Sequence, residues 1–376
     1  MTAIEPRRLG LDVVARMWEA LTGRIDHFLF GITMTIVLVG MITLFSAADQ
    51  NMARVANQLT SLAVALVAMW VMANIAPQTL ARAALPLYVI SVVLLVCVAV
   101  FGISVNGSRR WLNLGITRIQ PSELAKIALP LMLAWYFQKY EGRIGWKGFV
   151  FATVLIVIPV FLIKRQPDLG TALLLTASGF YVLYLAGLSW KVIVGLAVAA
   201  AAAAPLAWTF TMHNYQRQRV LTFLDPARDP LGAGYHSAQA SIAIGSGGVV
   251  GKGWLNGTQT HLDFLPERHT DFIFAVFGEE FGLVGNVVLL ILYLMLIGRG
   301  MVISANASTL FGRLVAGTIT LMLFTYAFVN MGMVSGILPV VGVPLPFLSF
   351  GGTSLLSLFI GIGILMSVQA HRKINI

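Results

Sequence analysis

The feature that most constrains this chain is a series of ten apolar runs, each about as long as a membrane is thick. Such a run can cross the hydrocarbon core only as a helix, because backbone polar groups find no partners in lipid outside their own segment. The sequence, with 58% hydrophobic and 11% charged residues, therefore predicts an all-α, polytopic membrane protein of about ten transmembrane helices in a single domain over 1–376. The runs lie at about 28–46, 55–74, 86–105, 122–138, 148–164, 169–187, 190–211, 271–298, 310–335 and 348–369.

The distribution of Lys and Arg predicts the orientation of these helices. The side that holds both termini carries thirteen basic residues in its short loops and ends, and the short loops of the other side carry six. In membrane proteins the cytoplasmic loops carry more Lys and Arg than the outer loops do, so we expect both termini in the cytoplasm. The segment 212–270 is then one large extracytoplasmic loop between the seventh and eighth helices.

A cluster of ionisable residues stands where this loop enters the eighth run, in the stretch FLPERHTDFIFAVFGEE at 264–280. Charge at a membrane boundary is costly, so the cluster indicates a functional site. Asp271 fits a general base and is expected in the first turn of the eighth helix, with Thr270 as the N-cap. The alternative is that Asp271 only caps the helix. The cluster consists of Glu267, Arg268, His269 and Asp271.

Two further acidic sites are expected on the same outer side. In QPSELAK, Glu123 and Lys126 are three residues apart and share one helix face, and Ser122 is the predicted N-cap. The pair is either a structural ion pair or an orienting pair under a substrate. In KRQPDLGTA, Asp168 either caps the sixth helix or contacts the substrate.

Basic residues flank apolar runs on the outer side and need a separate explanation. They either contact anionic lipid head groups or bind the phosphates of an anionic, lipid-linked substrate. The rest of the net charge of +10 follows from the cytoplasmic bias, and no basic face with interleaved aromatic residues indicates nucleic-acid binding. The flanking residues meant here are Arg109, Arg110, Lys164 and Arg165 of the short outer loops, together with Arg217 and Arg219 of the long loop.

Three other patterns carry less weight. The glycine-rich GSGGVVGKG at 245–253 fails as a phosphate-binding loop because Gly253 stands where Ser or Thr is needed, so we expect a flexible or closely packed part of the outer loop. The stretch PVVGVPLPFLSFGGTS at 339–354 is either a structural kink or the wall of a polar cavity. Glu279 and Glu280 are expected to face the bundle interior or the cytoplasmic half.

Five motifs together resemble one family, the SEDS proteins of shape, elongation, division and sporulation. The resemblance covers about 28–370, and Arg268 with the short tails is more similar to its elongation (RodA) branch than to its division (FtsW) branch, which usually has Ala there. The motifs are NGSRRW, QPSELAK, QPDLGTA, LPERHTDFIFAVFGEEFGLVG and PFLSFGGTS.

The resemblance implies a peptidoglycan glycosyltransferase of the bacterial inner membrane that polymerises lipid II on the outer face. The essential aspartate of the family matches Asp271, and its charged pair matches Glu123 and Lys126. It also implies a class B penicillin-binding protein as partner, the transpeptidase of the new glycan, together with other proteins of the elongation complex.

The mechanism we expect has Asp271 accept the proton of an acceptor hydroxyl, with undecaprenyl pyrophosphate as the leaving group. A pyrophosphate leaves without a protonating acid when cations neutralise it, so one carboxylate suffices. A divalent cation, Mg or Mn, is a candidate aid, and no organic cofactor is expected. A transporter of lipid-linked precursors and a noncatalytic scaffold are the alternatives. The candidate substrate-binding residues are Arg109, Arg110, Glu123, Lys126, Lys164, Arg165, Asp168, Arg268 and His269.

Overall fold

The computed structural model of the chain is built almost entirely from helices. It describes residues 23–105, 108–113, 118–166, 168–211, 217, 220–223, 225, 233–261 and 267–372. The helices are α2 (His27–Ala47), α3 (Met52–Asn74), α4 (Pro77–Phe101), α5 (Pro121–Lys139), α6 (Trp146–Lys164), α7 (Leu169–Leu185), α8 (Trp190–Leu206), α10 (Ala233–Ser246), α11 (Thr258–His261), α12 (Ile273–Ala305), α13 (Leu310–Val334) and α14 (Gly352–Ala370), with a π-helical turn η1 at Ala207–Thr211. The strands are β1 (Ile103–Val105), β2 (Ser108–Asn113) and β3 (Arg118–Ile119).

Each of the ten predicted apolar runs overlaps one of these helices, which confirms the all-α, multi-pass membrane architecture. Within the residues that the structure describes, seven helices are long and apolar enough to cross a membrane: α2, α3, α4, α6, α12, α13 and α14. The apolar helices α7 and α8 are shorter, and α5 carries Glu123, Lys126 and Lys139 within its 19 residues. The number of spans therefore stays a prediction.

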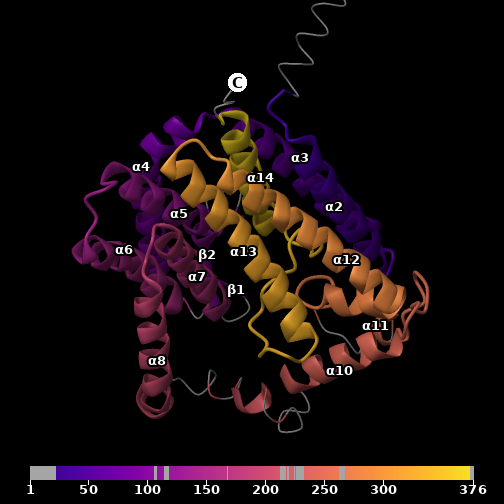
Figure 1. Ribbon diagram of the computed structural model, residues 1–376. Helices are drawn as coiled ribbons and strands as arrows, with labels where there is room; N and C mark the ends of the chain where they lie inside the picture. Colours follow the sequence, from indigo (N-terminus) through magenta and orange to yellow (C-terminus); the bar gives the residue numbers. More distant parts are fainter. Residues whose placement is uncertain are drawn as a thin grey trace, which may run out of the picture.

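The helices pack in two groups, which are visible in Figure 1. Buried apolar side chains of α2, α3 and α12 lie in one core, and those of α4, α5, α6 and α7 lie in the other, with residues of α13 and α14 in both. The described residues at the two chain ends, Arg24 and Arg372, line one cavity, whereas α10 and α11 lie at the opposite end of the molecule (Figure 1). The loop predicted at 212–270 contains these two helices.

Several helix ends differ from the sequence prediction, and two of them flank the strands. The run at 86–105 stops being helical at Phe101, because Gly102 is extended (φ −63°, ψ 142°), and the chain continues into an antiparallel three-stranded ribbon in the order β1, β2, β3. The fourth predicted helix begins at Pro121, with Gln120 rather than Ser122 as its N-cap. A proline has no N–H to satisfy at the first helical position, so it fixes this start without a side-chain cap.

Candidate active site

Asp271 lies in a turn, residues 267–272, that we call the aspartate turn. Helix α12 begins only after it, at Ile273 with Phe272 as N-cap, so the prediction that Asp271 occupies the first helical turn behind a Thr270 cap is wrong. The hydroxyl of Thr270 instead donates to the backbone oxygen of Glu267, 3.2 Å away. The turn is not helical because its backbone oxygens bind groups far away in the sequence.

Those groups belong mainly to the proline-rich segment, residues 337–351, which precedes α14. The amide of Phe350 donates to the backbone oxygen of His269 at 2.9 Å, and the hydroxyl of Ser349 donates to that of Thr270 at 2.7 Å. The amide of Asn330, fully buried in α13, donates to the backbone oxygen of Asp271 at 2.8 Å. Three consecutive backbone oxygens of the aspartate turn are thus held from outside it.

The carboxylate of Asp271 is half-buried and lies against the proline-rich segment. A Cβ built on Gly342 would be 3.3 Å from its Oδ2 atom, and a Cβ built on Gly170 would be 2.7 Å from the backbone oxygen of Val341. The first turn of α7, which contains Gly170, therefore packs on the same part of the segment that Asp271 contacts. A side chain at Gly170 would push the two backbones apart, and one at Gly342 would displace the Asp271 carboxylate by a few tenths of an ångström.

Asp168 lies at this end of α7, where the sequence predicts that it either caps the helix or contacts the substrate. It caps α7 by accepting from the amide of Thr171 at 3.1 Å, which confirms the predicted cap. Its Oδ2 atom also lies 3.6 Å from Nη1 of Arg110, on strand β2. The ribbon therefore brings a guanidinium next to the first turn of α7. Arg109 pairs with Ser104 through the backbone, and its side chain lies outside the described residues.

Glu123 and Lys126 form a buried pair between three helices. The ammonium of Lys126, 6% exposed, lies 2.7 Å from Oε1 of Glu123 and donates to the hydroxyl of Tyr326 on α13 at 2.6 Å. The other oxygen of Glu123 accepts from Ser357 on α14 at 2.6 Å. The pair thus joins α5, α13 and α14 through protein contacts, as the structural alternative expects.

The remaining basic candidates have different surroundings. Lys164 and Arg165 are exposed at the end of α6, where Arg165 covers the ring of Phe161 at 4.7 Å. Arg268 is buried and binds both the backbone oxygen of Thr260 and the carboxylate of Asp49. Among the described residues, Arg110 thus lies at the first turn of α7, which packs on the segment that Asp271 contacts, whereas Arg268 lies in the aspartate turn itself and binds groups of two other loops.

His269 is half-buried in the aspartate turn, with its ring edge-on to Phe350 at 6.0 Å between centroids. Burial and the nearby Arg54 guanidinium lower the pKa of His269, against an opposing effect of Glu267. Below the unfolded pKa of about 6.5, the unfolded chain then binds this proton more readily than the folded chain does. The free energy of unfolding therefore keeps its full contribution from neutral His269 above about pH 6.5 and loses this contribution as the pH falls below that value.

We expect the Tm of the wild-type protein to fall between pH 7.5 and 5.5 by more than the Tm of a His269→Gln variant does. The measurement is thermal unfolding of the purified protein at the two pH values. A His371→Gln variant, changed at the other end of the molecule, controls for loss of an imidazole as such. An unchanged pH response in His269→Gln would contradict the expectation.

The sequence and fold of the chain match known proteins. A family model described as "Cell cycle protein" and named for FtsW, RodA and SpoVE matches residues 21–374. The chain belongs to this family. The SEDS resemblance inferred from the motifs is thereby confirmed.

Individual relatives match three quarters or more of this FtsW/RodA/SpoVE member. "Peptidoglycan glycosyltransferase MrdB" of Escherichia coli is 52% identical over 349 residues, 93% of this chain and 94% of its own. "Probable peptidoglycan glycosyltransferase FtsW" of Geobacter metallireducens is 38% identical over 285 residues, 75% of each chain.

Solved structures agree with the fold. A chain of a peptidoglycan synthase complex, described as coordinating polymerization and crosslinking, has a TM-score of 0.80 at 34% identity and covers 92% of this chain and 97% of its own. The rod shape determining protein RodA of Thermus thermophilus has a TM-score of 0.70 at 31% identity, covering 93% of this chain and 98% of its own. The predicted similarity to RodA is confirmed.

Sequence reasoning missed several polar residues that build the site in this family member. Asn330 and Tyr326 are polar groups inside the apolar run at 310–335, and such a placement is by itself a signal of function or of a buried partner. Ser349 and Ser357 gave no comparable signal. Their roles depend on contacts with residues far away in the sequence, with Thr270 and Glu123 respectively.

A resident divalent cation, Mg or Mn, would need several side-chain ligands close together. Among the described residues, no three His, Cys, Asp or Glu side chains form a group that could hold a metal ion. Magnesium often binds through one or two carboxylates and the phosphates of a substrate rather than in a protein cage. The described protein residues alone do not fit a resident metal, and we assign no step to one.

Proposed function

We propose that this chain is a peptidoglycan glycosyltransferase that polymerises lipid II into glycan strands during cell elongation. Its nearly full-length similarity to a protein named peptidoglycan glycosyltransferase supports the activity. The observation that supports the site is the aspartate turn, whose three consecutive backbone oxygens are held by Asn330, Ser349 and Phe350 while the Asp271 carboxylate lies against Gly342. A carboxylate held in this way suits a general base, which must meet its proton in a fixed geometry.

In the proposed reaction, Asp271 takes the proton of an acceptor sugar hydroxyl. The oxygen attacks the anomeric carbon of the donor, and the bond from that carbon to the diphosphate oxygen breaks. Undecaprenyl pyrophosphate leaves with the bonding electrons, and the anomeric configuration is inverted. Arg110 is our candidate for neutralising the diphosphate, since its guanidinium stands at the first turn of α7, which packs on the segment that Asp271 contacts.

The sidedness of the reaction is also a proposal. The basic residues favour cytoplasmic termini, and the described residues at the two ends lie opposite α10 and α11 (Figure 1). This arrangement supports an extracytoplasmic site on the bacterial inner membrane, where energy comes from the activated lipid donor. A structural neighbour belongs to a complex that couples polymerisation to crosslinking, which supports a class B penicillin-binding protein and further elongation proteins as partners.

The test is polymerisation of lipid II by the purified protein in detergent, alone and with a class B penicillin-binding protein. We expect glycan polymer, measured by gel separation of labelled product. A transporter of the same precursor is the competing function. Movement of labelled lipid II across vesicles without any polymer would overturn the proposal in favour of transport.

A further inference from the structure

The glycine-rich stretch that failed as a phosphate-binding loop has a definite structural partner. Residues 247–260, which we call the clasp loop, bind the backbone of α12 where that helix is broken. Gly282 there has φ 65° and ψ −161°, which are not helical, so nearby backbone groups of α12 lose their regular helical partners. The clasp loop supplies replacements: the amides of Lys252 and Gly253 each donate to α12 backbone oxygens at 3.0 Å, and the amides of Leu283 and Val284 donate back to the loop at 2.9 and 3.0 Å.

Glycine is required at this contact because the two backbones touch. A Cβ on Gly251 would lie 2.1 Å from the backbone oxygen of Glu280, and a Cβ on Gly282 would lie 2.3 Å from the backbone nitrogen of Gly251. Both residues also have positive φ, which disfavours other side chains. The loop is therefore closely packed, one of its two predicted descriptions.

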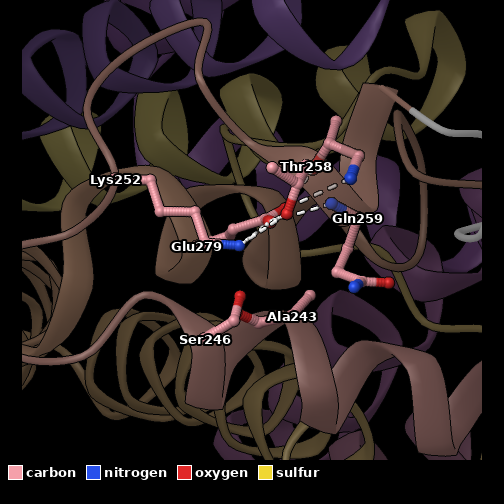
Figure 2. A network of polar contacts seen from close by, with 7 residues as sticks. Ala243, Ser246, Lys252, Thr258, Gln259 and Glu279 are labelled. Atoms are coloured by element: carbon pink, nitrogen blue, oxygen red, sulfur yellow. Dashed lines mark hydrogen bonds and ion pairs between the residues drawn. The ribbon is translucent and has the colours of Figure 1, made fainter.

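Glu279, one residue before this contact, is fully buried and faces the clasp loop (Figure 2). Its Oε1 atom accepts from the ammonium of Lys252 at 2.7 Å, from the amide of Gln259 at 2.9 Å and from the hydroxyl of Thr258 at 3.2 Å. Its Oε2 atom accepts from the amide and hydroxyl of Thr260 at 3.1 and 2.8 Å. Five donors converge on one carboxylate, and all of them belong to the outer loop. The prediction that Glu279 faces the bundle interior or the cytoplasmic half is therefore wrong, because the outer loop packs on the break in α12 and buries this side chain.

The clasp loop also contacts the aspartate turn. The backbone oxygen of Thr260, whose amide Glu279 binds, accepts from the guanidinium of Arg268, and Arg268 also pairs with Asp49 before α3. Arg268 is three residues before Asp271 in the turn. The links from Glu279 to Thr260 and from Thr260 to Arg268 are direct contacts of buried side chains, and the backbone of the aspartate turn connects Arg268 to Asp271.

We propose that Glu279 and Lys252 are positioning residues of the transferase. This inference rests on the proposed function. Their ion pair fixes the clasp loop on the broken helix α12, and through Thr260 and Arg268 the loop sets the place of the aspartate turn and of Asp271. Neither side chain takes part in the reaction itself.

The test compares Glu279→Gln with Asp26→Asn, which are both carboxylate-to-amide changes in buried ion pairs. Asp26 pairs with Arg299 at the end of the molecule away from the clasp loop, and Asn can still cap α2 as Asp26 does. Glu279→Gln places an amide group against the donors of the clasp loop. We expect its kcat for lipid II polymerisation, per folded protein, to fall about 10- to 100-fold, the cost of a displacement near 1 Å. KM should change by less than about twofold, because substrate contacts remain.

Two companion variants and a measurement of motion separate positioning from a general loss of stability. Lys252→Arg keeps the charge and should retain most of the kcat, whereas Lys252→Met should lower it as Glu279→Gln does. Hydrogen exchange of backbone amides should become faster in Glu279→Gln at 255–261 and also at 267–275, and Asp26→Asn should leave both stretches at wild-type rates.

If Glu279→Gln speeds hydrogen exchange at 255–261 but leaves 267–275 at wild-type rates, the proposed coupling between the clasp loop and the aspartate turn is overturned. An equal loss of kcat in Asp26→Asn at equal Tm would overturn it as well. If the wild-type protein makes no polymer, the proposed function fails, and the exchange measurement still decides whether Glu279 holds the turn.

Discussion

Asp271→Asn is expected to lower the rate of lipid II polymerisation by about 10²- to 10⁴-fold, the usual contribution of a general base. The amide has the size of the carboxylate and can rest against Gly342 in the same way, but it cannot accept the acceptor proton. The backbone contacts of the turn with Asn330 and Ser349 are unaffected by the change. We therefore expect a stable protein with wild-type Tm and almost no polymer, measured with equal amounts of folded protein.

The matched control for this variant is Glu267→Gln. Glu267 is an exposed carboxylate in the same turn, four residues before Asp271. The same chemical change there should leave polymerisation within about threefold of wild type, since an exposed group away from the reacting atoms contributes little. Polymer synthesis by a stable Asp271→Asn protein at near the wild-type rate would refute the base assignment.

Glu123→Gln is expected to produce the largest loss of stability among these changes. It leaves the ammonium of Lys126 buried between α5, α13 and α14 without its counter-ion, and such a loss costs about 3 to 5 kcal/mol. Tyr326 still accepts a hydrogen bond from Lys126 but carries no charge to replace the carboxylate. The measurement is thermal unfolding in detergent, where the Tm should fall well below that of wild type.

The double variant Glu123→Gln/Lys126→Met separates the two roles considered for this pair. Removing both charges eliminates the uncompensated ammonium, so we expect most of the Tm to return and polymerisation to return with it. This outcome corresponds to an ion pair that joins three helices beneath the proline-rich segment. Polymerisation that stays lost after the Tm has recovered would instead favour an orienting role toward the substrate.

The architecture was largely predictable because lipid leaves the backbone few alternatives. All ten apolar runs overlap helices, since helix formation satisfies their polar groups locally. What failed was local detail at the ends. Thr270 and Ser122 have the side chains of N-caps, yet Phe272 and Gln120 occupy those positions, because contacts with Ser349 and Phe350 and the proline at 121 decide where the helices begin.

The site was predictable only as a set of candidates. The cost of charge near lipid singled out Asp271, Glu123 and Lys126, and the structure links two of them in one buried pair. Sequence spacing carried no information on which distant residue each would meet. Arg268 looked like a substrate cation, but a buried guanidinium takes whichever acceptors surround it, in this case Asp49 and the backbone of Thr260.

The contact between the aspartate turn and the proline-rich segment also has a consequence for synthesis of the chain. Asp271 leaves the ribosome well before Ser349 and Phe350, which hold the turn, so a nascent chain contains the base before it contains the groups that fix it. Helix α13 and the proline-rich segment must be inserted before the backbone contacts of the turn are complete. In a chain cut short anywhere before residue 337, every ionisable residue of the candidate site has been made, but the groups of the proline-rich segment that hold the aspartate turn are missing.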